Sequence, residues 1–257
     1  MINMKGFNIW LLSLIFLSAG CSSVGITGRS RLMLVSQGEE TALGLHAYQE
    51  ILKTSKISTD AKNTQLVNKV GARIAAASGV NYDWRFTLIE DKQINAFCLP
   101  GGKVAVYTGI LPYTQTEEGL AVVMAHEVAH ALARHGAERM SQEMLLGTGL
   151  NITGAALDQN ANKNLIMSAL GAGGQIGVLL PYSRKHELEA DRIGLILMAK
   201  AGYNPQYAVE FWQRMAKTGN GAAAGFLSTH PSDSNRISEI QKYLPEAMQY
   251  YRRNYNE

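Results

Sequence analysis

The sequence predicts an α+β fold that is mainly helical, with a small β-sheet beside a central helix. Two capped helical patterns come first, three β-like segments follow around a Pro-Gly-Gly turn, and further helical patterns run to the C-terminus. With 46% hydrophobic and 18% charged residues in 257, the composition is that of a globular protein. The formal charge of +3, without a concentrated Lys/Arg run, gives no support for nucleic-acid binding.

The first twenty residues have the pattern of a secretory signal peptide. Lys5 precedes an apolar run that is well short of the roughly 20 residues needed to span a bilayer. Small residues then lead to Cys21, as in a bacterial lipobox, where the cysteine is lipidated and becomes the first mature residue. Ser18 replaces the usual leucine, so plain secretion and an uncleaved anchor remain alternatives. The expected organisation is a signal peptide over 1–20, a lipidated N-terminus and tether over 21–36, and one domain over 37–257.

Two helices are predicted ahead of the sheet, each with recognisable ends. Ser36 and Glu39 form a capping box before an apolar helical pattern. The second helix should run from Asp60 to Ala77 and stop at Gly79. Strands are then expected over 84–89, 94–99 and 103–108, the last two joined by the Pro-Gly-Gly turn.

The central helix carries the pattern His126-Glu127-Val128-Ala129-His130. A capping box of Thr114 and Glu117 predicts its start, and the helical pattern continues to about Met140. Four residues are slightly more than one turn, so the two imidazoles share a face and can hold one zinc ion. Glu127 would then act as the general base on the water at the open side of the metal. This pattern predicts metal-assisted hydrolysis, most often of peptide bonds.

The remaining chain is expected to be helical, with one unusual apolar stretch. Between residues 145 and 180 it is rich in glycine and alanine, and a transmembrane hairpin remains an alternative there, although each half is short and interrupted by glycine. We therefore interpret it as a lid or a packed helix pair, with contact to lipid left open. Later helices are expected after Pro181, after the turn at 202–205 and over about 232–253.

The third metal ligand must come from outside the central helix, because a catalytic zinc takes three protein ligands and one water. The acidic cluster over 186–191 is the candidate. Glu187 and Asp191 are four residues apart and share a helical face. We expect Glu187 on the metal and Asp191 accepting the outward N–H of a ligand histidine, and other assignments within this cluster remain alternatives.

Two residues near the C-terminus complete the predicted site. His230 is the candidate to stabilise the oxyanion, the alternatives being a fourth metal ligand in a resting state and a structural turn histidine. Arg236 would either support that network or be a surface charge. His46, His135 and His186 are interpreted as ordinary surface or packing residues.

A predicted strand beside the central helix could hold an extended peptide by main-chain pairing. The candidate substrate-binding edge is Asn95, Ala96 and Phe97. Cys98, which follows in the same apolar segment, is interpreted as a buried structural thiol.

These motifs occur together and in a fixed order. Asn95-Ala96-Phe97 with the Pro-Gly-Gly turn, the paired histidines, the segment over 183–191 and His230-Pro231 resemble a known family. It is the HtpX-like and CAAX-prenyl-protease-like zinc metallopeptidase family of the gluzincin group. The resemblance covers about residues 40–245 and is strongest to the lipoprotein branch, which is similar to BepA, LoiP and the Oma-type proteases.

The resemblance implies a zincin-like fold and an endopeptidase with one Zn²⁺ per chain on His126, His130 and Glu187. Its substrates would be misfolded or misassembled cell-envelope proteins. The expected partners are such proteins, the membrane through a lipid on Cys21, and the outer-membrane assembly machinery, with no nucleic acid. Ser22 after the cysteine favours the periplasmic face of the outer membrane, the inner membrane being the alternative.

Two other functions remain as alternatives. A non-proteolytic assembly factor or chaperone could use the same groove to bind partners. An exopeptidase would need a charged residue that holds a substrate terminus, and the sequence does not reveal one.

Overall fold

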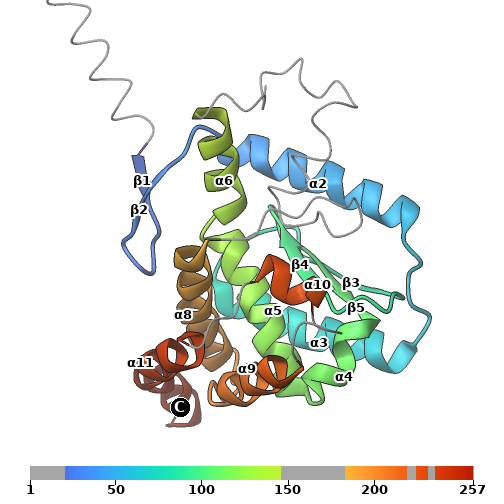
Figure 1. The fold of residues 1–257 in the computed structure, drawn as a ribbon, viewed down its shortest axis with the longest axis vertical. Helices are drawn as coiled ribbons and strands as arrows, with labels where there is room; N and C mark the ends of the chain where they lie inside the picture. The colour runs from blue at the N-terminus through green and yellow to red at the C-terminus, as the bar shows by residue number, and fades with distance from the viewer. Residues whose placement is uncertain (1–20, 146–182, 219–223, 231–234, 257) are drawn as a thin grey trace, which may run out of the picture.

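The computed structural model of the chain describes residues 21–145, 183–218, 224–230 and 235–256. Its helices surround one three-stranded sheet, with α5 at the centre (Figure 1). The elements, in chain order, are β1 (Cys21–Ser23), β2 (Ser30–Leu32), α2 (Gln37–Thr54), α3 (Ala61–Ser78), β3 (Arg85–Ile89), β4 (Ala96–Leu99), β5 (Lys103–Tyr107), the 3₁₀ turn η1 (Thr108–Ile110), α4 (Leu111–Thr114), α5 (Glu117–Leu132), α6 (His135–Leu145), α8 (Arg184–Lys200), α9 (Tyr207–Lys217), α10 (Ala224–Thr229) and α11 (Arg236–Asn256).

The first two predicted helices are confirmed, together with the residues that begin and end them. Ser36 and Glu39 form the capping box of α2, each side chain accepting a hydrogen bond from the other's backbone N–H. Asp60 caps α3 by accepting from the N–H of Asn63. Gly79 ends α3 in the left-handed conformation, with φ of 67°.

The predicted sheet is also confirmed. Its strand order is β3-β5-β4, with β3 parallel and β4 antiparallel to β5. The β4–β5 turn needs glycine at Gly101 and Gly102, whose φ angles of 78° and 82° are strained for other residues. Along β4, Ala96 and Cys98 belong to the core around α3 and α5, whereas Phe97 belongs to a second core under α2. The sheet is therefore covered on both faces.

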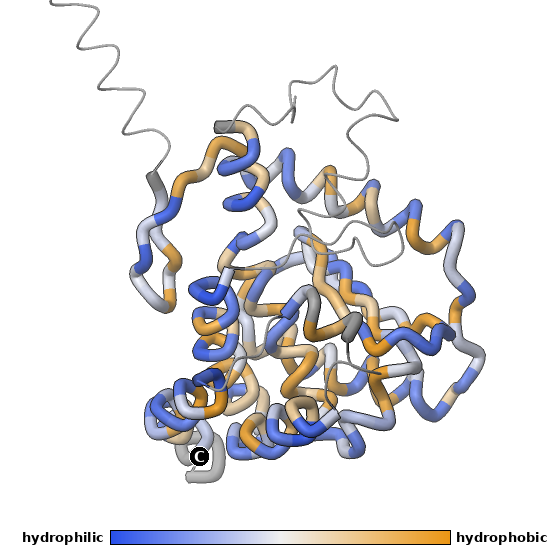
Figure 2. The backbone as a smooth tube through the Cα atoms, in the orientation of Figure 1, coloured by the Kyte–Doolittle hydropathy of each residue, from blue (hydrophilic) through white to orange (hydrophobic). Residues whose placement is uncertain are grey.

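α5 is the element against which most of the domain packs. α3, β4, α8 and α9 all contact it, and Figure 2 shows α2, at the periphery, alternating between hydrophilic and hydrophobic residues. α8 lies between α5 and α11, both of which it contacts extensively. The α+β fold with a small sheet beside the central helix agrees with the prediction.

The prediction of one helix from Thr114 to about Met140 is wrong at both ends. Thr114 closes the short helix α4, and Gln115, with φ of 62°, reverses the chain so that Thr116 becomes the cap of α5. At the other end, Arg134 has φ of 54° and separates α5 from α6. Its guanidinium donates to the carboxylate of Glu40 at 2.5 Å, which holds this unusual turn in place.

Part of the predicted tether over 21–36 is ordered. β1 and β2 pair antiparallel, with Cys21 opposite Leu32, and form a hairpin that lies beside α6 and α8 (Figure 1). The prediction missed it because the strands have three residues each and no periodicity. What holds the hairpin is the contact of Thr27 and Arg29 with buried glutamates of the domain.

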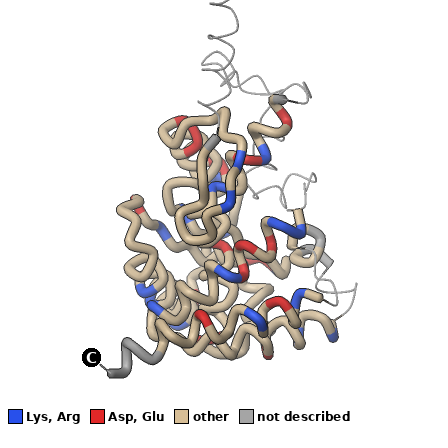
Figure 3. Tube along the Cα trace, turned by 90° about the vertical axis from the view of Figure 1, so that its left-hand side faces the viewer, with Lys and Arg blue, Asp and Glu red and all other residues tan. Residues whose placement is uncertain are grey.

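The predicted signal peptide over 1–20 and nearly all of the apolar stretch over 145–180 lie outside the described residues. Within the described part of the chain, no helix combines the length and apolarity that crossing a membrane requires. Basic and acidic residues are interspersed along this part of the chain (Figure 3).

Candidate metal centre

α5 holds His126 and His130 one turn apart inside the protein. Thr116 begins the helix by accepting a hydrogen bond from the N–H of Gly119, and every residue from Gly119 to Ala131 is buried. The two imidazoles face the same way, with their Nε2 atoms 3.0 Å apart. The helix therefore presents two nitrogen atoms at one buried point.

α8 brings a carboxylate against this pair. Gly194 allows the close approach of α8 to α5, because a Cβ there would lie 3.2 Å from the backbone nitrogen of His126. The Oε2 atom of Glu187 lies 3.3 Å from Nε2 of His126, and its Oε1 atom lies 3.3 Å from Nε2 of His130. The structure thus brings the predicted third ligand to the paired histidines.

His230, at the end of α10, adds a third imidazole. Its Nδ1 atom lies 3.1 Å from Oε1 of Glu187 and 3.2 Å from Nε2 of His126. Ligand atoms from His126, His130, Glu187 and His230 all lie within 4.8 Å of one another, and all four residues are buried. This cluster of four residues is called the metal cluster below.

The metal cluster fits a tetrahedral zinc ion. Asp191 Oδ1 lies 2.9 Å from Nδ1 of His126, so Nδ1 is the protonated nitrogen and Nε2 presents a lone pair. That lone pair faces Nε2 of His130 at 3.0 Å, an arrangement that a cation between them would stabilise. Ligands about 2.0–2.1 Å from zinc in a tetrahedron are roughly 3.3–3.4 Å apart. The separations of 3.0–3.3 Å in the cluster are close to that value.

Glu127 lies beside the metal cluster without belonging to it. Its Oε1 atom is 3.3 Å from Nε2 of His230. Burial raises the pKa of Glu127 to about 7, although the neighbouring charge of His230 acts in the opposite direction. Near neutral pH this carboxylate can therefore both accept and release a proton, as a general base must.

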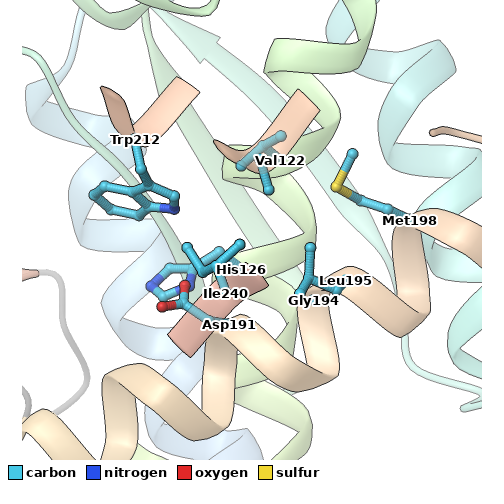
Figure 4. A pocket seen from close by; sticks show the side chains of 9 residues that line it. Val122, His126, Asp191, Gly194, Leu195, Met198, Trp212 and Ile240 are labelled. Carbon is cyan, nitrogen blue, oxygen red and sulfur yellow. The ribbon is translucent and has the colours of Figure 1, made fainter. Parts of the chain in front are cut away.

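Asp191 and Arg236 form a buried pair behind His126. Arg236 donates from Nε and Nη2 to the two Asp191 oxygens, at 2.8 Å each, and its Nη1 lies 2.9 Å from Oε2 of Glu187. Its guanidinium lies 3.4 Å above the centre of the Trp212 ring. Figure 4 shows Asp191 beside the His126 imidazole, at a small and mostly apolar cavity. Burial alone would raise the pKa of Asp191, but the contacts with Arg236 and His126 together outweigh it and lower that pKa.

The predicted substrate-binding edge is at the edge of the sheet. The N–H of Tyr107 donates to the carbonyl of Asn95, so Asn95 and Phe97 face β5 with their main-chain groups, and Ala96 and Cys98 face away. The N–H of Ala96 donates to the side-chain oxygen of Asn95 at 2.9 Å and not to a neighbouring strand. The side chains of Asn95, Ala96 and Phe97 are buried. This edge can therefore offer a peptide mainly its backbone.

Two histidines that the sequence analysis interpreted as ordinary belong to the buried network. His135 is fully buried, and its Nδ1 lies 2.9 Å from Nδ1 of His130. His186 is also buried and stacks on His135, with ring centres 4.4 Å apart. The available signal was the position of His135 shortly after His130, but a straight helix would point the two rings apart. His46 is exposed, as expected.

Comparisons with known proteins agree with this geometry. The model of Peptidase family M48 matches residues 61–244. The chain is 40% identical over 230 residues to the mitochondrial metalloendopeptidase OMA1 of Schizosaccharomyces pombe, an alignment that covers 87% of this chain and 66% of that protein. For the protein of the same name from Saccharomyces cerevisiae, identity is 33%, with 88% and 70% covered.

The beta-barrel assembly-enhancing protease of Escherichia coli is 29% identical, with 83% of this chain and 45% of that protein covered. This chain therefore spans from less than half to about two thirds of the length of these relatives. The family match covers most of the described domain and includes every member of the metal cluster. The chain thus belongs to peptidase family M48, and zinc is the cofactor that its cluster of three histidines and one glutamate fits.

Proposed function

We propose that the chain is a zinc-dependent metalloendopeptidase in which His126, His130 and Glu187 hold the metal. The observation that carries this proposal is the convergence of the metal cluster and the Glu127 carboxylate at one buried point. Zinc, when bound, polarises the scissile carbonyl and makes water a better nucleophile. Glu127 takes a proton from the attacking water and passes it to the leaving amine. Asp191 keeps the His126 ring turned toward the metal by accepting from its Nδ1–H.

His230 is proposed to hold a fourth ligand position in the described conformation and to stabilise the oxyanion once a peptide displaces it. We expect the His230→Ala variant to retain one zinc per chain, because three ligands remain. Its kcat should fall by about 10²- to 10³-fold, the usual cost of losing one oxyanion donor. Steady-state kinetics and metal analysis check this. An unchanged or higher kcat would leave His230 only the role of a resting ligand.

The substrate is proposed to be an extended segment of a misfolded or misassembled cell-envelope protein, paired along β4. Support comes from the outward main-chain carbonyl of Ala96 and the outward main-chain groups of Cys98, and from the name of the Escherichia coli relative, a beta-barrel assembly-enhancing protease. Cys21, the first residue of β1, is proposed to carry a lipid that anchors the chain at the periplasmic face of the outer membrane. Outer-membrane assembly machinery is the proposed partner.

The proposal is tested by metal analysis of the mature protein together with casein cleavage. We expect about one zinc per chain, loss of cleavage on treatment with a chelator, and recovery when zinc is added back. The melting temperature should fall when the chelator removes the metal, because zinc that binds the folded state stabilises that state. A peptide N-methylated at the residue that would pair with β4 should be cleaved more slowly than its parent. Zinc-free protein that cleaves casein at the full rate would contradict the proposal.

A further inference from the structure

A chain of polar contacts leads from His130 to the N-terminal hairpin. The outward nitrogen of His130, Nδ1, lies 2.9 Å from Nδ1 of His135. The other nitrogen of His135, Nε2, lies 2.9 Å from Oε2 of Glu189. Because Glu189 can only accept, Nε2 of His135 carries the proton and its Nδ1 accepts from the N–H of His130. His135 thus orients His130, as Asp191 orients His126.

Glu189 is in turn held by the hairpin of residues 21–32. The hydroxyl of Thr27 donates to Oε1 of Glu189, and Nε of Arg29 donates to Oε2 at 2.6 Å. The two terminal nitrogens of Arg29, Nη1 and Nη2, donate to the two carboxylate oxygens of Glu138 in α6, at 2.7 and 2.6 Å. One guanidinium therefore ties α8 to α6 on either side of His135.

The electrostatics of this cluster make Arg29 hard to replace. The side chains of Glu189 and Glu138 are only 5% and 7% exposed, and that of Arg29 is 12% exposed. His135, Thr27 and Arg29 all contact the two oxygens of Glu189, which compensates for the burial of its charge. Without the guanidinium, the two carboxylates would repel each other and Glu189 would lose a partner that fixes its orientation.

We propose that Arg29 is a positioning residue for the metal centre, acting through Glu189 and His135 on the ring of His130. The inference rests on the proposed function only in taking His130 as a metal ligand. It assigns to the hairpin that begins at Cys21, the proposed anchor residue, a direct part in supporting the site. The segment expected to be a tether then contributes to metal affinity.

The test measures metal binding rather than proteolysis. We expect Arg29→Met to weaken zinc binding by up to about 10-fold in competition with a chromophoric chelator. This is the lower end of the usual range for losing a direct outer partner of a ligand histidine, because Arg29 acts through two further side chains. The absorption spectrum of the Co²⁺-substituted protein should change as well. Arg29→Lys should restore part of the affinity, because it keeps the charge and loses the fork. The isosteric Thr27→Val variant, which removes a single hydroxyl, should fold and show a smaller loss.

Arg31→Met is the matched control in the same hairpin. Arg31 donates to Ser22 and to the carbonyl of Ala133, so its loss loosens the hairpin without touching Glu189. Its zinc affinity and Co²⁺ spectrum should stay close to those of the unmodified chain. Adding Arg29→Met to a His135→Gln background should have little further effect, because both act on the same ring.

The inference fails if Arg29→Met and Thr27→Val bind zinc within twofold of the unmodified chain and with its Co²⁺ spectrum. It also fails if Arg31→Met weakens zinc as much as Arg29→Met does, since docking of the hairpin alone would then explain the effect. An unmodified chain that binds zinc but leaves casein intact would overturn the proposed protease activity and not this inference.

Discussion

Replacing Glu127 with glutamine should reduce casein cleavage by about 10²- to 10⁴-fold, the contribution typical of a general base. The amide has nearly the shape of the carboxylate but accepts no proton at neutral pH. Glu127 is not a member of the metal cluster, so zinc content should remain about one per chain. The measurement is kcat/KM for a peptide substrate beside metal analysis of the same preparation.

Glu118→Gln is the control for this variant, since it makes the same change in the first turn of the same helix, away from the cluster. Its activity should equal that of the unmodified chain. Full cleavage by the Glu127→Gln variant would rule out Glu127 as the base. If cleavage is lost but cells keep the envelope function of the protein, the result supports the alternative of a non-proteolytic assembly factor or chaperone.

The Arg236→Met variant is expected to lose about 3–5 kcal/mol of unfolding free energy, the usual cost of removing one partner of a buried ion pair. Methionine fills much of the space but leaves Asp191 and Glu187 without the guanidinium that contacts both. Arg236 is 1% exposed, so water cannot replace it. Urea unfolding in the presence of a chelator measures the change without a contribution from metal binding.

Arg192→Met offers a matched control between the same two helices. Arg192 of α8 makes a two-pronged contact with Glu246 of α11, but these side chains are 31% and 37% exposed. An exposed pair of this kind contributes up to about 1 kcal/mol. If both variants lose the same small amount, the Asp191–Arg236 pair does not stabilise the fold as the structure indicates.

Much of the metal cluster could be predicted because it rests on local geometry. The spacing of His126 and His130 dictates that they share a helical face, and the same rule groups Glu187 with Asp191. The structure brings these residues together at 2.9–3.3 Å. The capping residues of α2 and α3 were equally local, since each contact joins residues three apart.

The contacts that the sequence analysis missed join distant parts of the chain. Arg29 meets Glu189 across 160 residues and Glu138 across 109. Composition and periodicity carry no information on such pairs, so the sequence predicts only a tether for the segment that contains Arg29. The prediction of where α5 starts was wrong for another reason. Thr114 and Thr116 both precede a helical pattern, and only the turn at Gln115 decides which of them caps the helix.

The left-handed residue Arg134 determines more than the boundary of a helix. In an unbroken α-helix, side chains five positions apart point about 140° away from each other. The joint at Arg134 interrupts the helix between α5 and α6, and the ring of His135 reaches the ring of His130. A redesign that straightened this joint would keep every residue of the His-Glu-x-x-His signature, but it would move the ring of His135 away from the ring of His130. The signature alone is therefore an incomplete description of a working site in this chain.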